Sequence, residues 1–276
     1  MNLLNRFTSI ARVLDPRYPT NRAVLLLLAP AAGIAGAMAL LRGSGLPETA
    51  LSALFGAAAA LAGWAFAREL APDMERLAFL SLLLTFGAFL TVESSSLLLL
   101  FAAQFLVRVV NRSVGLPARI VDSVFVAGLT VWATWAGPFP GLALIGALAF
   151  GLDASMKERF LRHWVFAGLC LVAAGLSLDR QGQWWFSENL SPTAVGLLSI
   201  VAFAYGLTMW RTRRVTSPAD VTGKPLFSAR VLAGMAVGLL SGLQALARGQ
   251  AGLEAAALVW AVLASVPLGA LVWPRR

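Results

Sequence analysis

Long apolar runs recur along the whole chain, and this recurrence constrains the fold more than any other feature. A helix that crosses the hydrocarbon core of a bilayer needs about 20 mostly apolar residues, with about 17 as a lower limit. Ten runs approach or reach that length within the 276 residues, and the third, fourth and sixth need residues from their flanks: 23–41, 50–67, 77–92, 95–110, 120–136, 140–153, 163–178, 194–210, 231–247 and 255–273. The sequence therefore predicts an all-α polytopic membrane protein with ten spans.

The composition supports this class and excludes a soluble globular domain. Hydrophobic residues make up 59% of the chain and charged residues 13%, whereas soluble domains carry about 25% charged residues. Too few polar side chains remain to cover a surface that faces water. The net charge of +9 is of the kind seen in nucleic-acid-binding proteins, but the basic residues flank the apolar runs. We therefore expect no nucleic-acid partner.

The distribution of basic residues tests the number of spans independently. If each run crosses the membrane once, successive connections lie on alternate sides, and Lys and Arg concentrate on the cytoplasmic side. Under ten spans, 19 of the 22 basic residues fall on one side and 3 on the other. A wrong number of spans scrambles this alternation. The sequence thus predicts that both termini lie in the cytoplasm.

Three regions follow from this topology. Residues 1–22 form a basic cytoplasmic segment, 23–273 the ten-span domain and 274–276 a cytoplasmic tail. Within the first region, residues 3–14 place Leu3, Phe7 and Ile10 on one helical face, opposite arginines. This pattern predicts a short amphipathic helix in the membrane interface, with a frayed basic tail as the alternative.

One polar cluster stands out where the fourth run ends and the fifth begins. Gln104, Arg108 and Arg112 are spaced four residues apart and share a helical face, which Asn111 borders, and Asp122 lies about one turn into the next run. Two interpretations remain open. The cluster is either a cytoplasm-facing pocket for an anion or an anionic lipid head group, or a buried ion pair of Asp122 with an arginine that joins the two spans.

A second pattern is a row of glycines in the ninth run. Gly234, Gly238 and Gly242 form a GxxxGxxxG sequence. Such a row allows a close crossing of two membrane helices. We interpret it as a helix-packing feature, although a moving interface in a transporter uses the same pattern.

Signals for catalysis or for a cofactor are absent from the sequence. It contains no P-loop, no GxSxG, no HExxH and no pair of cysteines, since Cys170 is its only one. The single histidine, His163, has no serine or cysteine motif near it, so we give it no catalytic role. We therefore predict neither metal nor cofactor, and no enzyme activity as the first hypothesis.

Three functions remain compatible with these features. The first is a permease for a small solute or amphiphile, without the mid-membrane carboxylate that proton-coupled carriers use, because no run carries a charged residue near its centre. The second is a membrane-embedded enzyme or lipid-binding protein at the cytoplasmic face, and the third a structural subunit of a membrane complex. A central cavity lined by Gln104, Thr130 and Gln244 favours the first.

The expected surroundings follow from the same observations. Partners are membrane lipids, with anionic head groups at the cytoplasmic face, and further subunits or copies of the chain. Much alanine and arginine with little lysine is typical of a GC-rich bacterial genome. We therefore expect the protein in a bacterial plasma (inner) membrane.

Overall fold

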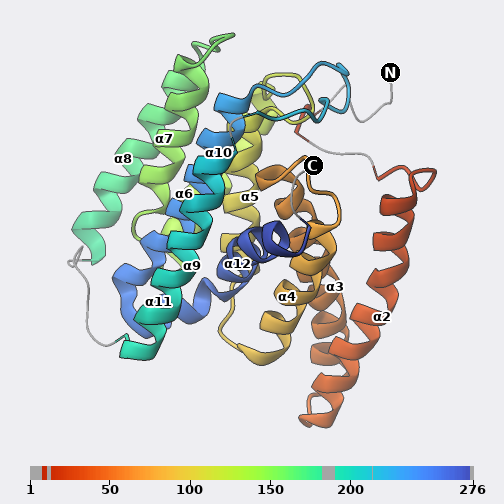
Figure 1. Cartoon of the computed structure of the whole chain (residues 1–276). Coiled ribbons are helices and arrows are strands. Elements are labelled where there is room, and N and C mark those ends of the chain that lie inside the picture. The colour runs from red at the N-terminus through yellow and green to blue at the C-terminus, as the bar shows by residue number, and fades with distance from the viewer. Residues whose placement is uncertain (1–7, 11–13, 182–189, 213, 274–276) are drawn as a thin grey trace.

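A computed structural model describes residues 8–10, 14–181, 190–212 and 214–273, and this part of the chain is helical without named strands (Figure 1). Four helical stretches are long and apolar enough to cross a membrane: α2 (Pro19–Leu41), α3 (Leu46–Leu70), α9 (Pro192–Arg211) and the stretch Ser228–Ala255, which contains α10 (Ser228–Leu243), the 3₁₀ helix η1 (Gln244–Arg248) and α11 (Gly249–Ala255). The other helices are also apolar: α4 (Leu77–Thr91), α5 (Leu97–Asn111), α6 (Ile120–Ala136), α7 (Leu142–Ser155), α8 (His163–Gln181) and α12 (Ala257–Val272).

Each of the ten predicted apolar runs coincides with one of these helical stretches. The boundaries differ by at most about four residues, except that the stretch Ser228–Ala255 extends beyond the end of the ninth run, 231–247. Local signals explain several of them. The Ser96 side chain accepts a hydrogen bond from the Leu99 amide at the start of α5, and Ser191 does the same at the start of α9. Pro192 then occupies the first turn of α9, where its missing amide costs nothing. The all-α prediction is confirmed for the described residues.

The connections between helices meet at two ends of the bundle. The α9–α10 connection donates backbone hydrogen bonds to the α5–α6 turn, from Asp220 to Ser113 and from Val221 to Val114. We call this end, which faces the top of Figure 1, the basic end, because most basic connections gather there. At the opposite end, Ser96 donates to the Ala255 carbonyl oxygen. The α5–α6 and α9–α10 connections therefore lie at one end, and the α4–α5 and α11–α12 connections meet at the other.

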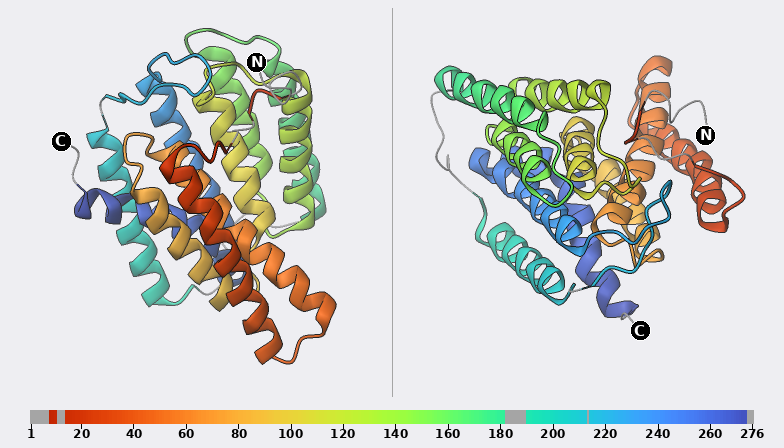
Figure 2. Two further views of the ribbon diagram at one scale, coloured as in Figure 1. Left: turned by 90° about the vertical axis from the view of Figure 1, so that its right-hand side faces the viewer. Right: turned by 90° about the horizontal axis from the view of Figure 1, so that it is seen from above.

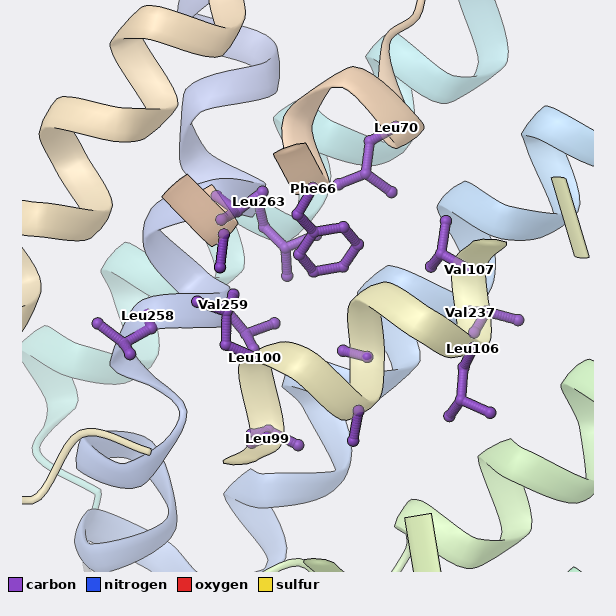
Figure 3. Close-up of a cluster of buried hydrophobic side chains, with 14 of the residues drawn as sticks. Phe66, Leu70, Leu99, Leu100, Leu106, Val107, Val237, Leu258, Val259 and Leu263 are labelled. Atoms are coloured by element: carbon purple, nitrogen blue, oxygen red, sulfur yellow. The ribbon is translucent and has the colours of Figure 1, made fainter. Parts of the chain in front are cut away.

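Helices α3, α5, α7, α10 and α12 contribute most to the interior of the bundle. Figure 3 shows Phe66 and Leu70 of α3 packed near Leu100 of α5 and Leu263 of α12, within one continuous cluster of buried apolar residues. Helices α2, α8 and α9 lie at the periphery (Figure 2), and α9 buries only Tyr205. Their exposed apolar faces suit contact with lipid.

The predicted amphipathic helix of residues 3–14 lies mostly outside the described residues. Its described members, 8–10 and 14, are not helical. Ser9 and Ile10 are instead buried against the basic end. The predicted tail, 274–276, also lies outside the described residues.

Candidate functional site

Helix α5 carries four of the five predicted polar residues to the basic end, and all five are buried. Arg108 and Arg112 lie one turn apart, yet their side chains have different partners. The helix ends at Arg112, whose backbone is left-handed with φ of 49°. This conformation is uncommon for a residue other than glycine. It ends the helix and separates the surroundings of Arg112 from those of Arg108.

Arg112 binds a carboxylate that the sequence analysis did not assign to the site. Its Nε and Nη2 donate to the two oxygens of Asp153 on α7, at 2.7 and 2.8 Å. Arg230 of α10 donates to Asp153 at 2.7 Å, and the His163 Nδ1 of α8 lies 2.7 Å from the other carboxylate oxygen. Asp153 is fully buried. We call Asp153, Arg112, Arg230 and His163 the Asp153 cluster, and it joins four helices.

The Asp153 cluster continues into an arrangement that resembles a hydrolase triad. The Ser123 hydroxyl lies 2.9 Å from the His163 Nε2, and His163 in turn contacts Asp153. However, all three side chains are fully buried, and neither of the cavities described below reaches them. The hydroxyl also donates to the Arg119 carbonyl oxygen at 2.9 Å. Because all three side chains are fully buried, we interpret this arrangement as structural.

Arg108 points into different surroundings on the other side of α5. Its Nε donates to the buried Glu69 carboxylate of α3 at 3.0 Å, and its Nη1 donates to the Ile10 carbonyl oxygen at 3.1 Å. Asn111 donates its side-chain amide to the Glu69 carbonyl oxygen at 2.7 Å. These contacts attach α5 to the end of α3 and to the N-terminal segment.

The ion-pair interpretation expects Asp122 to pair with Arg108 or Arg112. In the structure, both arginines pair with other carboxylates. It is the third residue of α6 and accepts the Arg119 amide at 3.0 Å, which completes the first turn of that helix. The Ser9 amide and hydroxyl donate to the same oxygen, at 2.8 and 2.9 Å. Asp122 therefore anchors the N-terminal segment. Arg108 and Arg112 pair instead with Glu69 and Asp153.

The glycine row of α10 contacts three helices rather than one. A Cβ atom at Gly234 would lie 1.9 Å from the Asn111 Oδ1 of α5. Gly238 faces Leu70 of α3, and Gly242 faces Leu263 of α12. The row thus lets α10 fit among its neighbours, and Gly234 in particular makes room for a side chain of the predicted polar site.

A cavity of about 1100 Å³ opens at the basic end among α2, α3, α5 and the α9–α10 connection. Its walls on α3 and α5 follow the same order from deep to shallow: an apolar residue, a residue with a hydrogen-bonding group, and an arginine. On α3 these are Leu61, Trp64 and Arg68, and on α5 they are Phe101, Gln104 and Arg108. The apolar residues Ala62, Ala65 and Phe105 line the same walls between them. The cavity is therefore amphipathic along its depth.

Two polar atoms along this cavity have no hydrogen-bond partner among the described residues. They are the Trp64 Nε1, which can only donate, and the Gln104 Oε1, which can only accept. Both side chains are at least 96% buried, with 3% and 4% of their surface exposed. A buried polar group without a partner costs about 1–3 kcal/mol. Both atoms have almost no accessible surface, so they lie within the wall of the cavity rather than on its surface.

A smaller recess of about 130 Å³ adjoins the cavity, and Arg68, Glu75, Pro218 and Asp220 line both. Arg68 pairs with Glu75 at 3.8 Å. The Ser113 hydroxyl belongs to the recess and has no hydrogen-bond partner among the described residues. The recess is therefore a polar extension at the mouth of the cavity.

The α9–α10 connection forms the outer wall of the cavity and of the recess. Asp73, in the α3–α4 turn, accepts hydrogen bonds from the backbone amides and hydroxyls of Thr216 and Ser217 at 2.6–3.2 Å. Burial raises the pKa of Asp73, but these hydrogen bonds outweigh it and hold the pKa below its ordinary value. Gly115, with φ of 90°, allows Thr222 to approach the α5–α6 turn closely.

The other residues expected around a central cavity lie elsewhere. Thr130 donates to the Val126 carbonyl oxygen within α6. Gln244 accepts the Gly141 amide at the opposite end of the bundle. Only Gln104 of the three lines the large cavity.

Trp64, Arg68 and Asp153 were not predicted from the sequence as members of these sites. One signal was present for the first two, because Trp64 and Arg68 are spaced four residues apart, like Gln104 and Arg108. No group of three or more His, Cys, Asp or Glu residues in the described part of the chain is arranged to hold a metal ion.

Comparisons with protein-family models, with curated proteins and with solved structures find no match for this chain. Its function is therefore argued from its own geometry.

Proposed function

We propose that this chain is an integral membrane protein of ten spans that binds an amphiphile in the cavity at its basic end. The observation that carries the proposal is the amphipathic order of the cavity wall, repeated on α3 and α5. An acyl or other apolar chain suits the deep part between Leu61 and Phe101. A polar head group suits the mouth, where Arg68 and Arg108 lie.

The ten spans and the orientation belong to the same proposal. Four helical stretches have the length of a span, and the shorter apolar helices lie beside them in one bundle. Described connections that meet at two opposite ends of the bundle support ten crossings. The positive-inside rule then places the basic end, with both termini, at the cytoplasmic side of the plasma membrane.

Cysteine mapping in intact cells tests this topology, and the single native cysteine makes it simple. In a Cys170→Ser background, we expect a cysteine at the exposed Lys224 to react with a membrane-impermeant maleimide only after permeabilisation. A cysteine at the exposed Gln250, at the opposite end, reacts in intact cells. The reverse result, or equal labelling, contradicts the proposed orientation.

Lipid retention tests the binding proposal. Native mass spectrometry of the purified protein in detergent counts the amphiphiles that remain bound. Leu61→Trp fills the deep part of the cavity, and we expect it to lower retention of a single-chain phospholipid about tenfold. The matched control Leu54→Trp lies on the exposed face of the same helix and leaves retention unchanged. Equal retention by both variants refutes the cavity as the site.

A permease for the same amphiphile is the second candidate, because one wall of the cavity belongs to a peripheral helix. Helix α2 packs on α3 through small residues, such that a Cβ at Gly56 would lie 2.5 Å from the Ala35 Cβ. Small residues at an interface allow helices to slide past each other with little steric cost. The test is the rate at which a fluorescent phospholipid crosses a liposome membrane containing the protein. Transport that Leu61→Trp abolishes supports the permease, whereas retention without transport limits the function to binding.

A further inference from the structure

We infer that the amphiphile is a lipid of the cytoplasmic leaflet, and that it enters the cavity sideways from the bilayer, between α2 and α5. This inference rests on the proposed function, because it names the source of the ligand and its route into the same cavity. The other route leads from the cytoplasm through the basic end. The packing of α2, a row of aromatic side chains and the depth of the cavity favour the bilayer.

Helix α2 forms a wall of the cavity without packing along the opposite wall, α5. Thr20 and Asn21 of α2 line the cavity, as do Phe101 and Phe105 of α5. Helix α2 packs along α3 and touches α4, whereas its contact with α5 among the described residues is marginal at most. It lies on the outside of the bundle (Figure 2). Helix packing therefore does not close the side of the cavity between α2 and α5.

A row of phenylalanines leads from the cavity to the outer surface of the bundle. The Phe101 and Phe105 rings lie with their centroids 6.4 Å apart, and both side chains are partly exposed. Phe105 in turn packs edge-on against Phe125 of α6, at 5.4 Å between the centroids. Phe125 is 51% exposed and does not line the cavity. The apolar wall of the cavity is thus continuous with a surface that suits contact with lipid.

The cavity is about as deep as one leaflet of a bilayer. Phe101 lies ten residues before the end of α5, and Leu61 nine residues before the end of α3. The cavity therefore extends about 14–15 Å from the basic end along these helices, and the hydrocarbon core of a bilayer is about 30 Å thick. Under the proposed orientation the cavity matches the cytoplasmic half of that core. A lipid of this leaflet enters with its chain already at the right depth.

The two routes differ in what the acyl chain passes. Between α2 and α5 the chain stays in contact with hydrocarbon and with the phenylalanine row. At the basic end the lining residues include Asp15, Arg17 and Asp220, and the chain has to cross water before it reaches them. Exposing an apolar chain to water is unfavourable. The sideways route keeps the chain out of water throughout.

Spin labelling tests the route without the need to identify the lipid. In a Cys170→Ser background, a nitroxide label at Leu61→Cys reports from the deep part of the cavity in liposomes. Oxygen concentrates in hydrocarbon, whereas a water-soluble nickel chelate stays in water. We expect the label to collide often with oxygen and rarely with nickel, like a label at Leu54→Cys on the exposed face of the same helix. A label at Lys224→Cys, exposed at the basic end, gives the opposite ratio.

Lipid exchange gives a second test, which does not depend on a label inside the cavity. Native mass spectrometry of the purified full chain in detergent follows the replacement of an isotope-labelled phospholipid by its unlabelled form. Phe125→Gln places a polar side chain at the outer end of the phenylalanine row, and we expect exchange to slow several-fold while retention at equilibrium is kept. The matched control Val124→Gln changes the neighbouring exposed residue of α6 and leaves the exchange rate unchanged.

The possible failures are distinguishable. Nickel access at Leu61 equal to that at Lys224 indicates a route through the cytoplasmic end, which overturns the inference but leaves an amphiphile-binding cavity. A label that meets neither reagent indicates a sealed cavity and overturns the inference as well. Equal exchange rates of Phe125→Gln and Val124→Gln have the same consequence. Retention that is insensitive to Leu61→Trp overturns the proposed function together with the inference.

Discussion

The two sides of helix α5 show how similar residues acquire different roles. Arg112 lies in the Asp153 cluster, where both carboxylate oxygens accept hydrogen bonds from buried arginine or histidine side chains, although the Arg230 Nε has no partner among the described residues. Arg108, one turn earlier, lines a cavity along which Gln104 keeps an unsatisfied acceptor. A buried charge whose neighbours satisfy it holds helices together. The other arginine lines a cavity that is large enough to hold a ligand.

The first prediction has the largest expected effect and concerns the carboxylate at the centre of the Asp153 cluster. Asp153→Asn keeps the shape of the side chain but leaves Arg112 and Arg230 buried without their shared countercharge. Breaking a buried pair in this way costs about 3–5 kcal/mol. We expect a large fall in the thermal unfolding temperature of the purified protein, or failure to accumulate in the membrane.

The control for this prediction is Glu158→Gln. Glu158 also approaches Arg112, at 4.0 Å, but its side chain is 59% exposed. We expect a change close to zero, as for most exposed ion pairs. Equal effects of the two variants disprove the central role of Asp153.

The second prediction concerns the contact between α10 and the predicted polar site. Gly234→Ala places a methyl group against Asn111, and overpacking of this kind costs about 1–3 kcal/mol. Gly206→Ala, on the exposed helix α9 with no atom within 4 Å, is neutral or stabilising. Unfolding in a denaturant series compares them. If Gly234→Ala leaves the free energy of unfolding unchanged, the glycine row tolerates larger residues and the prediction is wrong.

The third prediction compares two glutamines, Gln104 beside the cavity and Gln244 in a hydrogen bond between helices. Gln104→Leu removes an unsatisfied group, so we expect unchanged stability and about tenfold weaker retention of the amphiphile. Gln244→Leu removes the acceptor of the Gly141 amide, which costs about 1 kcal/mol of stability, and leaves retention unchanged. Native mass spectrometry and thermal unfolding together separate these outcomes. The comparison fails if Gln104→Leu destabilises the fold and retains the ligand.

The fourth prediction has the smallest effect on global stability and concerns the outer wall of the cavity. The hydrogen bonds from Thr216 and Ser217 lower the pKa of Asp73, so their contribution is complete above its ordinary pKa. It is lost as the pH falls through the lower pKa of the folded state. Asp73→Ala removes the contact at every pH. We expect faster hydrogen exchange at the amides of residues 216 and 217, whereas the amides of α5 exchange as before.

Much of the secondary structure could be predicted from the sequence. Each apolar run coincides with a helix, because a chain with so few polar residues must satisfy its backbone groups internally. Serine caps and prolines marked where α5 and α9 begin. The polar cluster was also located correctly in the chain, since Gln104, Arg108 and Asn111 lie in the second half of α5 and Arg112 follows the helix directly.

Only the tertiary structure decided which partner each of these residues meets. Arg108 pairs with Glu69, 39 positions earlier, and Arg112 with Asp153, 41 positions later. Helical spacing shows which side chains share a face, but it says nothing of the helix that the face contacts. For the same reason the sequence suggested Asp122, the nearest carboxylate along the chain, whereas packing brought distant helices together. The cavity likewise exists only where α3, α5 and the α9–α10 connection meet.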